Sequence, residues 1–327
     1  MQNNIDVSVV IPVYDNKIGL MRCLLSLSGQ RYPKDNYEVI VVDDGSRDGL
    51  NECIEEQRKH YLLELKYIYQ CHKGPAAARN AGIAKAQGKI VVFTDSDCVA
   101  KESWLEEVIK GYYDIRVAGV GGVIKANPTS SIISQYCAYV KMNEEPKIDT
   151  SGIVYLITGN ASFKKECLES VGGFDERYSF PGGEDPDLCY RLKQNGYIFQ
   201  CNRNAVVYNS HKETLKSLSL SYFCYGKGES YLNLRKMYSW DFNSVKGFRR
   251  FLTFFISIYR ILIVSFKALT LFLKLPFFIL YYHREGLMAR QSCSYALLDY
   301  IKNLSFIFGY MIGRLKWFDK NNESGIL

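Results

Sequence analysis

The chain has 327 residues and a mass of 37.5 kDa, which allows one large domain or two ordinary ones and excludes a peptide or a purely disordered protein. The net charge of +7 comes from the last quarter of the sequence, because residues 246–327 hold 12 Lys and Arg against 4 Asp and Glu, while residues 1–245 hold 29 against 30. This basic tail is also aromatic and apolar, which favours a membrane surface over nucleic acid as its partner.

Ten cysteines are spread along the chain, with no Cys-x-x-Cys pair and no His at zinc-finger spacing. We therefore expect reduced thiols in a cytosolic compartment. The start of the sequence does not show the basic segment, apolar segment and small-residue cleavage site that a secretory signal needs. We expect this part of the chain to remain in the cytoplasm.

The first half of the chain alternates short β-branched runs with longer amphipathic stretches. This pattern is typical of βα units that build a mostly parallel sheet, and strands so apolar are typical of burial on both faces. We expect strands at 7–11, 38–42, 65–69 and 90–94, and helices at 17–27, 49–61 and 75–86. The next part is less regular, with strands expected at 118–124 and 205–208 and helices at 164–171 and 187–195. We place a domain boundary at residue 245, where the composition changes.

Residues 251–282 predict an apolar helix with one narrow polar stripe, because Arg260, Lys267 and Lys274 recur every seven residues. Its longest uncharged stretches reach only about half of the roughly 18 to 20 residues of a membrane span. A helix that lies in the membrane interface, with its lysines reaching outward, fits this pattern better. Pro276 is expected to kink or end the helix.

A second helix of the same kind is expected over residues 292–316. It carries Gly309 and Gly313, a spacing of small residues that occurs at close helix contacts and also arises by chance. Both helices fit association with a membrane, including insertion as a hairpin. The alternative is that they form a soluble dimer interface or cover the sheet.

Polar residues follow the first two expected strands. The first strand ends in Pro12-Val13-Tyr14 with no Gly-x-Gly-x-x-Gly turn, which excludes a dinucleotide-binding Rossmann site. The second runs into Asp43-Asp44-Gly45-Ser46, at the edge where open α/β sheets bind ligands. A carboxylate there can accept hydrogen bonds from a base or a ribose, and Asp-Gly also marks any tight turn.

The fourth strand runs straight into Asp95-Ser96-Asp97. Two hard oxygen ligands at a sheet edge suit a divalent cation that itself holds a diphosphate, and the alternative is a solvated turn. Arg79 follows the Gly74-Pro75 helix start and adds a positive group that favours phosphate. It could equally be a surface residue of its helix.

A third acidic cluster lies around a Gly-rich turn at the start of a helix, in Gly183-Glu184-Asp185-Pro186-Asp187. Three carboxylates so close are costly neighbours unless one binds a cation or works as a base. The alternative is helix capping by Asp185, with Asp187 favourable in the first turn. His211 follows a strand, and a lone histidine is more often structural than a ligand.

Six motifs, taken in order, resemble glycosyltransferase family 2 with the GT-A fold. They are Val-Ile-Pro-Val-Tyr, Val-Asp-Asp-Gly-Ser, Ala-Arg-Asn-Ala-Gly, Asp-Ser-Asp, Val-Gly-Gly-Phe-Asp-Glu and Gly-Glu-Asp-Pro-Asp-Leu. The resemblance covers about residues 5–230. It implies an α/β fold with a mostly parallel central sheet flanked by helices, in which a sugar passes from a nucleotide-sugar to a hydroxyl.

The resemblance also implies roles for individual residues. Those expected to hold the donor nucleotide are Pro12, Tyr14, Asp44, Arg79 and Asp95. A divalent cation, Mn²⁺ or Mg²⁺, is expected at Asp97 and His211, and Asp185 is the expected catalytic base. Residues expected near the sugar or the acceptor are Asn160, Glu184 and Asp187.

Two departures from the motifs of this family narrow the range of reactions that we expect. Asp15 stands where Asn is common in the family, which we expect to be tolerated. The chain has neither a Gln-x-x-Arg-Trp motif after the acidic cluster nor the multi-span regions of processive synthases. We therefore expect inverting addition of a single sugar, from a UDP-sugar in the first instance, to a lipid-linked saccharide acceptor at the cytoplasmic face of a membrane.

Two alternatives remain open. A sugar-phosphate nucleotidyltransferase uses a related scaffold, but it needs a Gly-rich basic loop after the first strand, where this chain has Pro12-Val13-Tyr14-Asp15. A catalytically silent nucleotide-sugar-binding scaffold would keep the same carboxylates without product formation. A homo-oligomer is compatible with either.

Overall fold

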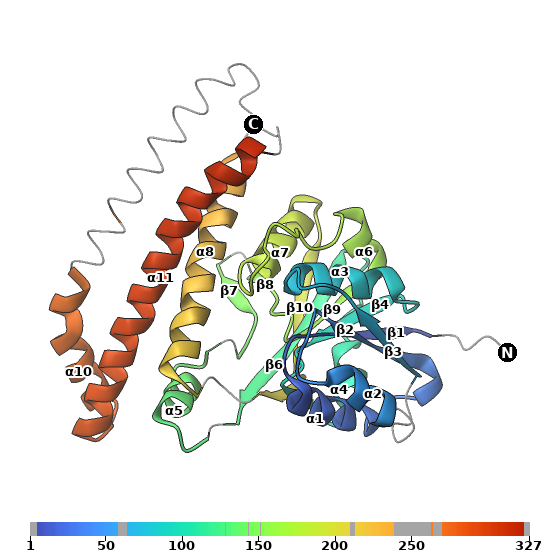
Figure 1. Cartoon of the computed structure of the whole chain (residues 1–327), viewed down its shortest axis with the longest axis horizontal. Helices are drawn as coiled ribbons and strands as arrows, with labels where there is room; N and C mark the ends of the chain where they lie inside the picture. The colour runs from blue at the N-terminus through green and yellow to red at the C-terminus, as the bar shows by residue number, and fades with distance from the viewer. Residues whose placement is uncertain are drawn as a thin grey trace. The chain divides into compact units, whose positions relative to one another are not determined.

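The computed structural model describes residues 5–57, 64–127, 129–142, 144–150, 152–209, 213–238, 263 and 270–323. The chain divides into two compact units (Figure 1). The first comprises residues 1–128 and 140–211, and the second comprises residues 129–139 and 212–327. The division therefore falls near residue 211, earlier than the boundary predicted at 245.

The first unit is built on an eight-stranded sheet in the order β3-β2-β1-β4-β9-β6-β10-β5. Its strands are β1 (Val7–Val13), β2 (Tyr37–Asp43), β3 (Glu64–Tyr69), β4 (Ile90–Thr94), β5 (Cys98–Ala100), β6 (Val117–Ala126), β9 (Asn160–Lys164) and β10 (Ile198–Asn209). Strands β9 and β5 run antiparallel to their neighbours, and the remaining pairs are parallel. A separate hairpin joins β7 (Lys147–Asp149) to β8 (Gly152–Tyr155).

The six strands expected from the sequence are all present, although 205–208 is only the end of the longer β10. Strand β1 is almost entirely buried, as its unbroken β-branched sequence predicts. Its odd-numbered residues belong to a core shared with α1 (Lys17–Ser28), α2 (Leu50–Gln57) and α4 (Trp104–Val108). Val10 faces the other way, where a Cβ on Gly82 would lie 2.3 Å from its side chain. Helices therefore cover both faces of this sheet, as Figure 1 shows.

The described part of this unit also contains the helices α3 (Pro75–Lys85), α6 (Lys165–Ser170) and α7 (Glu184–Gln194), together with the short η1 (Lys34–Asn36). Helix α3 begins at Pro75 as predicted, after Gly74 with φ of 96°. Helix α7 begins at Glu184, three residues before the predicted start, so that all three clustered carboxylates lie in its first turn.

The described residues of the second unit form helices. These are α5 (Ile132–Tyr139), α8 (Leu215–Tyr238), η3 (Phe272–Lys274), α10 (Leu275–Arg284) and α11 (Ala289–Glu323). Most of the helix predicted at 251–282, including Arg260 and Lys267, lies outside the described residues. Pro276 lies at the start of α10 rather than at a kink or an end. The helix predicted at 292–316 is confirmed within the longer α11. No helix of the described part of the chain is both long and apolar enough to cross a membrane.

Helices α8 and α11 pack side by side through glycines (Figure 1). A Cβ on Gly309 would lie 1.8 Å from the backbone oxygen of Phe223, and one on Gly226 would lie 2.0 Å from that of Phe306. A Cβ on Gly313 would meet the hydroxyl of Ser230 at 2.1 Å. The small-residue spacing in the tail therefore serves a helix contact within the chain, and α8 belongs to the tail unit for this reason.

Asp299 of α11 joins three helices of the second unit. Its carboxylate accepts hydrogen bonds from the hydroxyls of Tyr136 in α5 and Tyr282 in α10, and from the ammonium group of Lys302. Tyr295 packs edge-on against the Tyr136 and Tyr282 rings at centroid distances of 5.3 and 5.7 Å. Tyrosine side chains from three helices thus surround the partly exposed carboxylate of Asp299.

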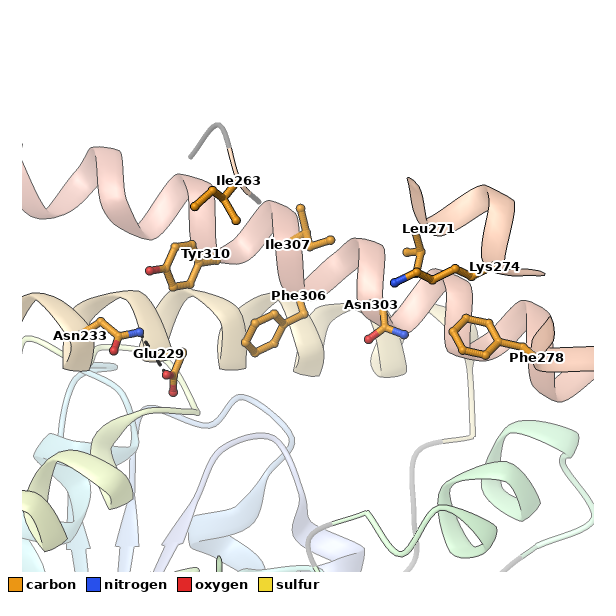
Figure 2. A pocket seen from close by; sticks show the side chains of 10 residues that line it. All are labelled: Glu229, Asn233, Ile263, Leu271, Lys274, Phe278, Asn303, Phe306, Ile307 and Tyr310. Carbon is orange, nitrogen blue, oxygen red and sulfur yellow. Dashed lines mark hydrogen bonds between the residues drawn. The ribbon is translucent and has the colours of Figure 1, made fainter. Parts of the chain in front are cut away.

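A cavity of about 700 Å³ lies beside α8 and α11 in the same unit (Figure 2). Its lining is mainly apolar, with Leu271, Phe278, Phe306 and Ile307 among the side chains that point into it. The polar part of the lining includes Glu229, which accepts a hydrogen bond from Asn233 at 3.1 Å.

Candidate active site

The site lies where the parallel strands of the first unit end. Val13 at the end of β1 pairs with Asp43 at the end of β2, and β4 lies on the other side of β1. The residues that follow these strands, Tyr14, Asp44 and Asp95, are therefore placed at one edge of the sheet. Pro12, the next-to-last residue of β1, is partly exposed there.

Tyr14 and His72 form an aromatic surface at this edge. Their ring centroids lie 4.2 Å apart with an interplanar angle of 32°. Tyr14 is 46% exposed, so a face of this pair is accessible to a ligand. The sequence singled out Tyr14, whereas His72 comes from a different loop and its place beside Tyr14 depends on the fold.

Asp44 is buried and its carboxylate holds the loop that precedes α3. One oxygen accepts hydrogen bonds from Gln70 at 2.7 Å and from the backbone N–H of Lys73 at 2.9 Å. The other accepts from the backbone N–H of Gly74 at 2.8 Å and lies 2.9 Å from His72 Nδ1. The structure therefore gives Asp44 a part in positioning this loop, and the predicted contact with a nucleoside stays a prediction.

Asp15 adopts a left-handed backbone conformation, with φ of 48°. Its carboxylate accepts a hydrogen bond from the backbone N–H of Arg47 at 2.7 Å, and its own N–H donates to the hydroxyl of Ser46. Asn and Asp are the side chains that tolerate this conformation best after Gly. This conformation therefore suits Asp15 as well as the Asn that the resemblance leads one to expect at this position.

Asp95 and Asp97 offer two carboxylates within reach of one cation. Their oxygens and the sulfur of Cys98 lie within 4.8 Å of one another. Both carboxylates are partly exposed, while Cys98 is buried. Mg²⁺ and Mn²⁺ prefer hard oxygen ligands, so the two carboxylates fit such an ion and the thiol does not.

The third predicted participant in this cation site, His211, lies outside the described residues. Asn209, two residues earlier at the end of β10, donates a hydrogen bond to Asp97 at 3.1 Å. The end of β10 therefore lies beside the carboxylate pair.

Arg79 is 5% exposed, so the reading of Arg79 as a surface residue is wrong. Its guanidinium donates to Glu184 at 2.9 Å and lies 3.5 Å from Asp95. Burial alone lowers the pKa of this guanidinium, but the carboxylates of Asp185, Glu184 and Asp95 together raise it above its usual value. Arg79 is therefore a fixed positive charge between β4 and α7.

The three carboxylates at the start of α7 have different partners. Glu184 accepts from Arg79 and from the backbone N–H of Gly182. Asp187 is fully buried and pairs with Arg191 at 2.8 Å. Asp185 accepts its hydrogen bonds from a neutral residue, Thr158, and stays partly exposed.

The environment of Asp185 makes it a stronger base than an ordinary aspartate. Burial and the negative charge of Glu184 raise its pKa to about 7, against the opposing effects of Arg79 and of hydrogen bonds from Thr158. A carboxylate with this pKa holds a proton more tightly than a free one and is still largely ionised above neutral pH. These are the properties of a general base for a hydroxyl group.

Asn160 lies at the start of β9 with its side chain turned into the core. Its amide N–H groups donate to the backbone oxygens of Val123 and Ala205, both at 2.9 Å, and its oxygen accepts from the indole of Trp104 at 2.8 Å. The side chain anchors a turn. The preceding Gly159 is the residue that approaches the site, since a Cβ there would lie 2.9 Å from the carboxylate of Asp95.

Comparison with known proteins identifies the family. The model of glycosyl transferase family 2 matches residues 8–172, and a model described as the N-terminal domain of galactosyltransferase matches residues 144–213. The pre-mycofactocin glycosyltransferase of Mycobacterium tuberculosis is 33% identical over 237 residues, which are 70% of this chain and 48% of that protein. Glycosyltransferase AglE of Haloferax volcanii is 33% identical over 194 residues, 58% of this chain and 62% of its own length. The chain thus matches about half to two thirds of these two relatives.

Solved structures show the same fold. Mannosyltransferase PcManGT from Pyrobaculum calidifontis, in complex with GDP-Man and Mn²⁺, superposes with a TM-score of 0.61 at 20% identity, covering 94% of this chain and 85% of its own. S. aureus TarS 1–349 in complex with UDP-GlcNAc superposes with a TM-score of 0.57 at 19% identity, covering 97% of this chain and 92% of the TarS chain. The chain belongs to glycosyltransferase family 2 and has the GT-A fold.

Proposed function

We propose that this enzyme adds a single sugar, with inversion, from a nucleotide-diphosphate sugar to a hydroxyl of a saccharide acceptor. The observation that carries this proposal is Asp185, which combines a raised pKa with partial exposure beside the carboxylates that follow β4. UDP is the nucleotide we favour, with GDP and dTDP as the other donors to test. The TarS complex with UDP-GlcNAc and the PcManGT complex with GDP-Man support a nucleotide-sugar at this fold.

Each residue has its own part in the proposed reaction. Tyr14 stacks on the base of the donor, with Pro12 and Asp44 completing the nucleoside site. Asp185 accepts the proton of the acceptor hydroxyl. At the same time the oxygen of that hydroxyl attacks the anomeric carbon of the donor sugar, on the face opposite the leaving nucleoside diphosphate. Asp97, with His211, would hold a divalent cation, which supplies charge neutralisation at the diphosphate. Arg79 keeps Asp95 and Glu184 in place between donor and acceptor.

A thermal-shift experiment tests the donor site. Purified protein is melted with UDP-, GDP- and dTDP-sugars, with and without Mn²⁺, beside Asp97→Ala. Donor at about 100 times its Kd should stabilise the wild-type protein by about 2.7 kcal/mol in the presence of Mn²⁺, because it binds only the native state. We expect the variant to lose this metal-dependent stabilisation.

The matched control for Asp97→Ala is Asp35→Ala, which removes an exposed carboxylate in η1 at the opposite end of β2. This variant should show the same rise in melting temperature with donor and Mn²⁺ as the wild-type protein. An Asp97→Ala protein that still shows the wild-type shift with Mn²⁺ would rule out Asp97 as a ligand. No shift with any donor, in well-folded wild-type protein, would contradict the proposed donor site, and product formation in a donor assay separates an enzyme from a silent binding protein.

We infer further that the acceptor is lipid-linked and that the second unit rests on a membrane. Phe277 and Leu280 of α10 are 71% and 60% exposed, and they lie in the segment that carries the basic excess. Exposed apolar side chains among Lys and Arg are typical of segments that lie in the interface of anionic membranes. The apolar cavity beside α11 in the same unit is compatible with a lipid neighbour.

Vesicle binding tests this surface without removing α11, whose loss would strip α8 of its packing partner. Phe277→Ser together with Leu280→Ser should lower the fraction bound to anionic phosphatidylglycerol vesicles at least about tenfold, because each lost side chain removes about 1.5–3 kcal/mol of burial. The matched control replaces Ile18 and Leu25 of α1, which are 71% and 65% exposed, and should bind normally. Equal binding by the α10 variant would contradict the proposed contact.

A further inference from the structure

Thr158 holds both oxygens of the Asp185 carboxylate. Its backbone N–H donates to one oxygen at 3.0 Å, and its hydroxyl lies 2.9 and 3.0 Å from the two oxygens. Thr158 is itself buried, at 2% exposure, so its own rotamer is constrained by packing. A carboxylate held from one side in this way presents its remaining lone pairs in a fixed direction.

The turn that carries Thr158 also touches the donor side of the site. Gly159, the next residue, lies against Asp95, and its backbone oxygen accepts a hydrogen bond from the hydroxyl of Thr94 at 3.1 Å. Asn160 then fixes the end of the turn in the core. Residues 158–160 therefore connect the Asp95 carboxylate to the Asp185 carboxylate through one short, anchored segment of backbone.

We propose that Thr158 is a positioning residue for the proposed base: it orients the carboxylate of Asp185 and sets its distance from the donor carboxylates. This inference rests on the proposed role of Asp185. The sequence contains no signal for it, because a Thr before Gly-Asn in a loop is ordinary turn chemistry. Only the fold brings residue 158 to the start of α7.

The charged groups around Asp185 define what a change at Thr158 would do. Glu184 on the same helix raises the pKa of Asp185, and Arg79 on α3 lowers it. Cys189, one turn along α7, has a pKa raised mainly by its burial, so it stays a neutral thiol. The two hydrogen bonds from Thr158 favour the ionised carboxylate, so loss of the hydroxyl should raise the pKa of Asp185 further.

The test compares Thr158→Val with Thr158→Ser. Valine keeps the backbone N–H and the shape of the side chain but removes the hydroxyl, whereas serine keeps the hydroxyl. We expect the acid limb of the pH profile of kcat to move up by about one pH unit in the valine variant, because a hydrogen bond to a charged group is lost. Turnover at pH 7 should fall about fivefold, because the ionised fraction of Asp185 falls by that factor, with little change in the KM for donor. The serine variant should restore both the pH profile and the turnover.

The outcomes separate this inference from the proposed function. If Asp185→Asn keeps turnover, the base assignment fails and the role of Thr158 fails with it. If Asp185→Asn is inactive but Thr158→Val has a wild-type pH profile and kcat, only the role of Thr158 is refuted, whatever its melting temperature. Should the valine variant not fold, Thr158→Ala is expected to show the same shift and is read in the same way.

Discussion

Asp185→Asn is expected to lower turnover by about 10²–10⁴-fold while leaving donor binding intact, because asparagine has the shape of aspartate but cannot accept the proton of the acceptor hydroxyl. Single-turnover assays measure the loss of chemistry, and the thermal shift with donor and Mn²⁺ measures binding. Near-normal turnover would show that another group is the base. Loss of the donor shift would instead place Asp185 in the donor site.

The same variant has a predictable effect on stability. The pKa of Asp185 is raised from 3.8 to about 7 in the folded protein, so the folded state holds this proton more tightly than the unfolded state does. The wild-type protein therefore loses stability as pH rises through the window from about 4 to about 7. Asparagine has no charge to bury, and Asp185→Asn should melt at or above the wild-type temperature at pH 8. In wild-type enzyme, turnover should rise across pH 7 as the carboxylate ionises.

Asp187→Ala, two residues away, should lower stability and leave the catalytic step nearly unchanged, which is the reverse of the effect expected for Asp185→Asn. Asp187 is fully buried, and the side chain of Arg191, its partner, is only 16% exposed. Removal of the carboxylate leaves a buried guanidinium without its counter-charge, which typically costs about 3–5 kcal/mol of unfolding free energy. Urea unfolding measures the loss. At low temperature, turnover per folded molecule should stay close to the wild-type value.

The matched control is Asp114→Ala, which breaks a similar pair with Arg116 at the surface, where the arginine side chain is 67% exposed. An exposed ion pair contributes little to stability because solvent screens it, so this variant should unfold at nearly the wild-type urea concentration. A stable but inactive Asp187→Ala protein would show that Asp187 acts in the acceptor site and does not mainly stabilise the fold.

The sequence was a good guide to the central sheet because burial on both faces demands unbroken β-branched runs. It did not predict β9, since Asn160-Ala-Ser-Phe-Lys164 has no such run and pairs with strands from distant parts of the chain. Helix α8 was also missed, because Gly226 and Gly228 weaken its helical pattern. Gly226 and Ser230 lie where α11 approaches α8 closely, and a local sequence pattern does not contain that contact.

The position of the candidate site could be predicted as well, because polar residues that follow parallel strands must meet at one edge. The separate tasks of its carboxylates could not. Glu184, Asp185 and Asp187 have the same chemistry in the sequence, and they differ only through partners that other segments supply. Arg79 neutralises Glu184, Thr158 orients Asp185, and Arg191 pairs with Asp187.

The insertion of β9 between β4 and β6 has a consequence for how the protein is made. Strand β4 ends at Thr94, yet its partner begins only at Asn160, so one edge of the growing sheet has no neighbour until that later segment leaves the ribosome. At about 5–20 residues per second, this interval lasts for seconds. During biosynthesis the nascent chain therefore carries an open, apolar strand edge, and the step that closes it joins segments far apart in sequence, which makes it a slow step of folding.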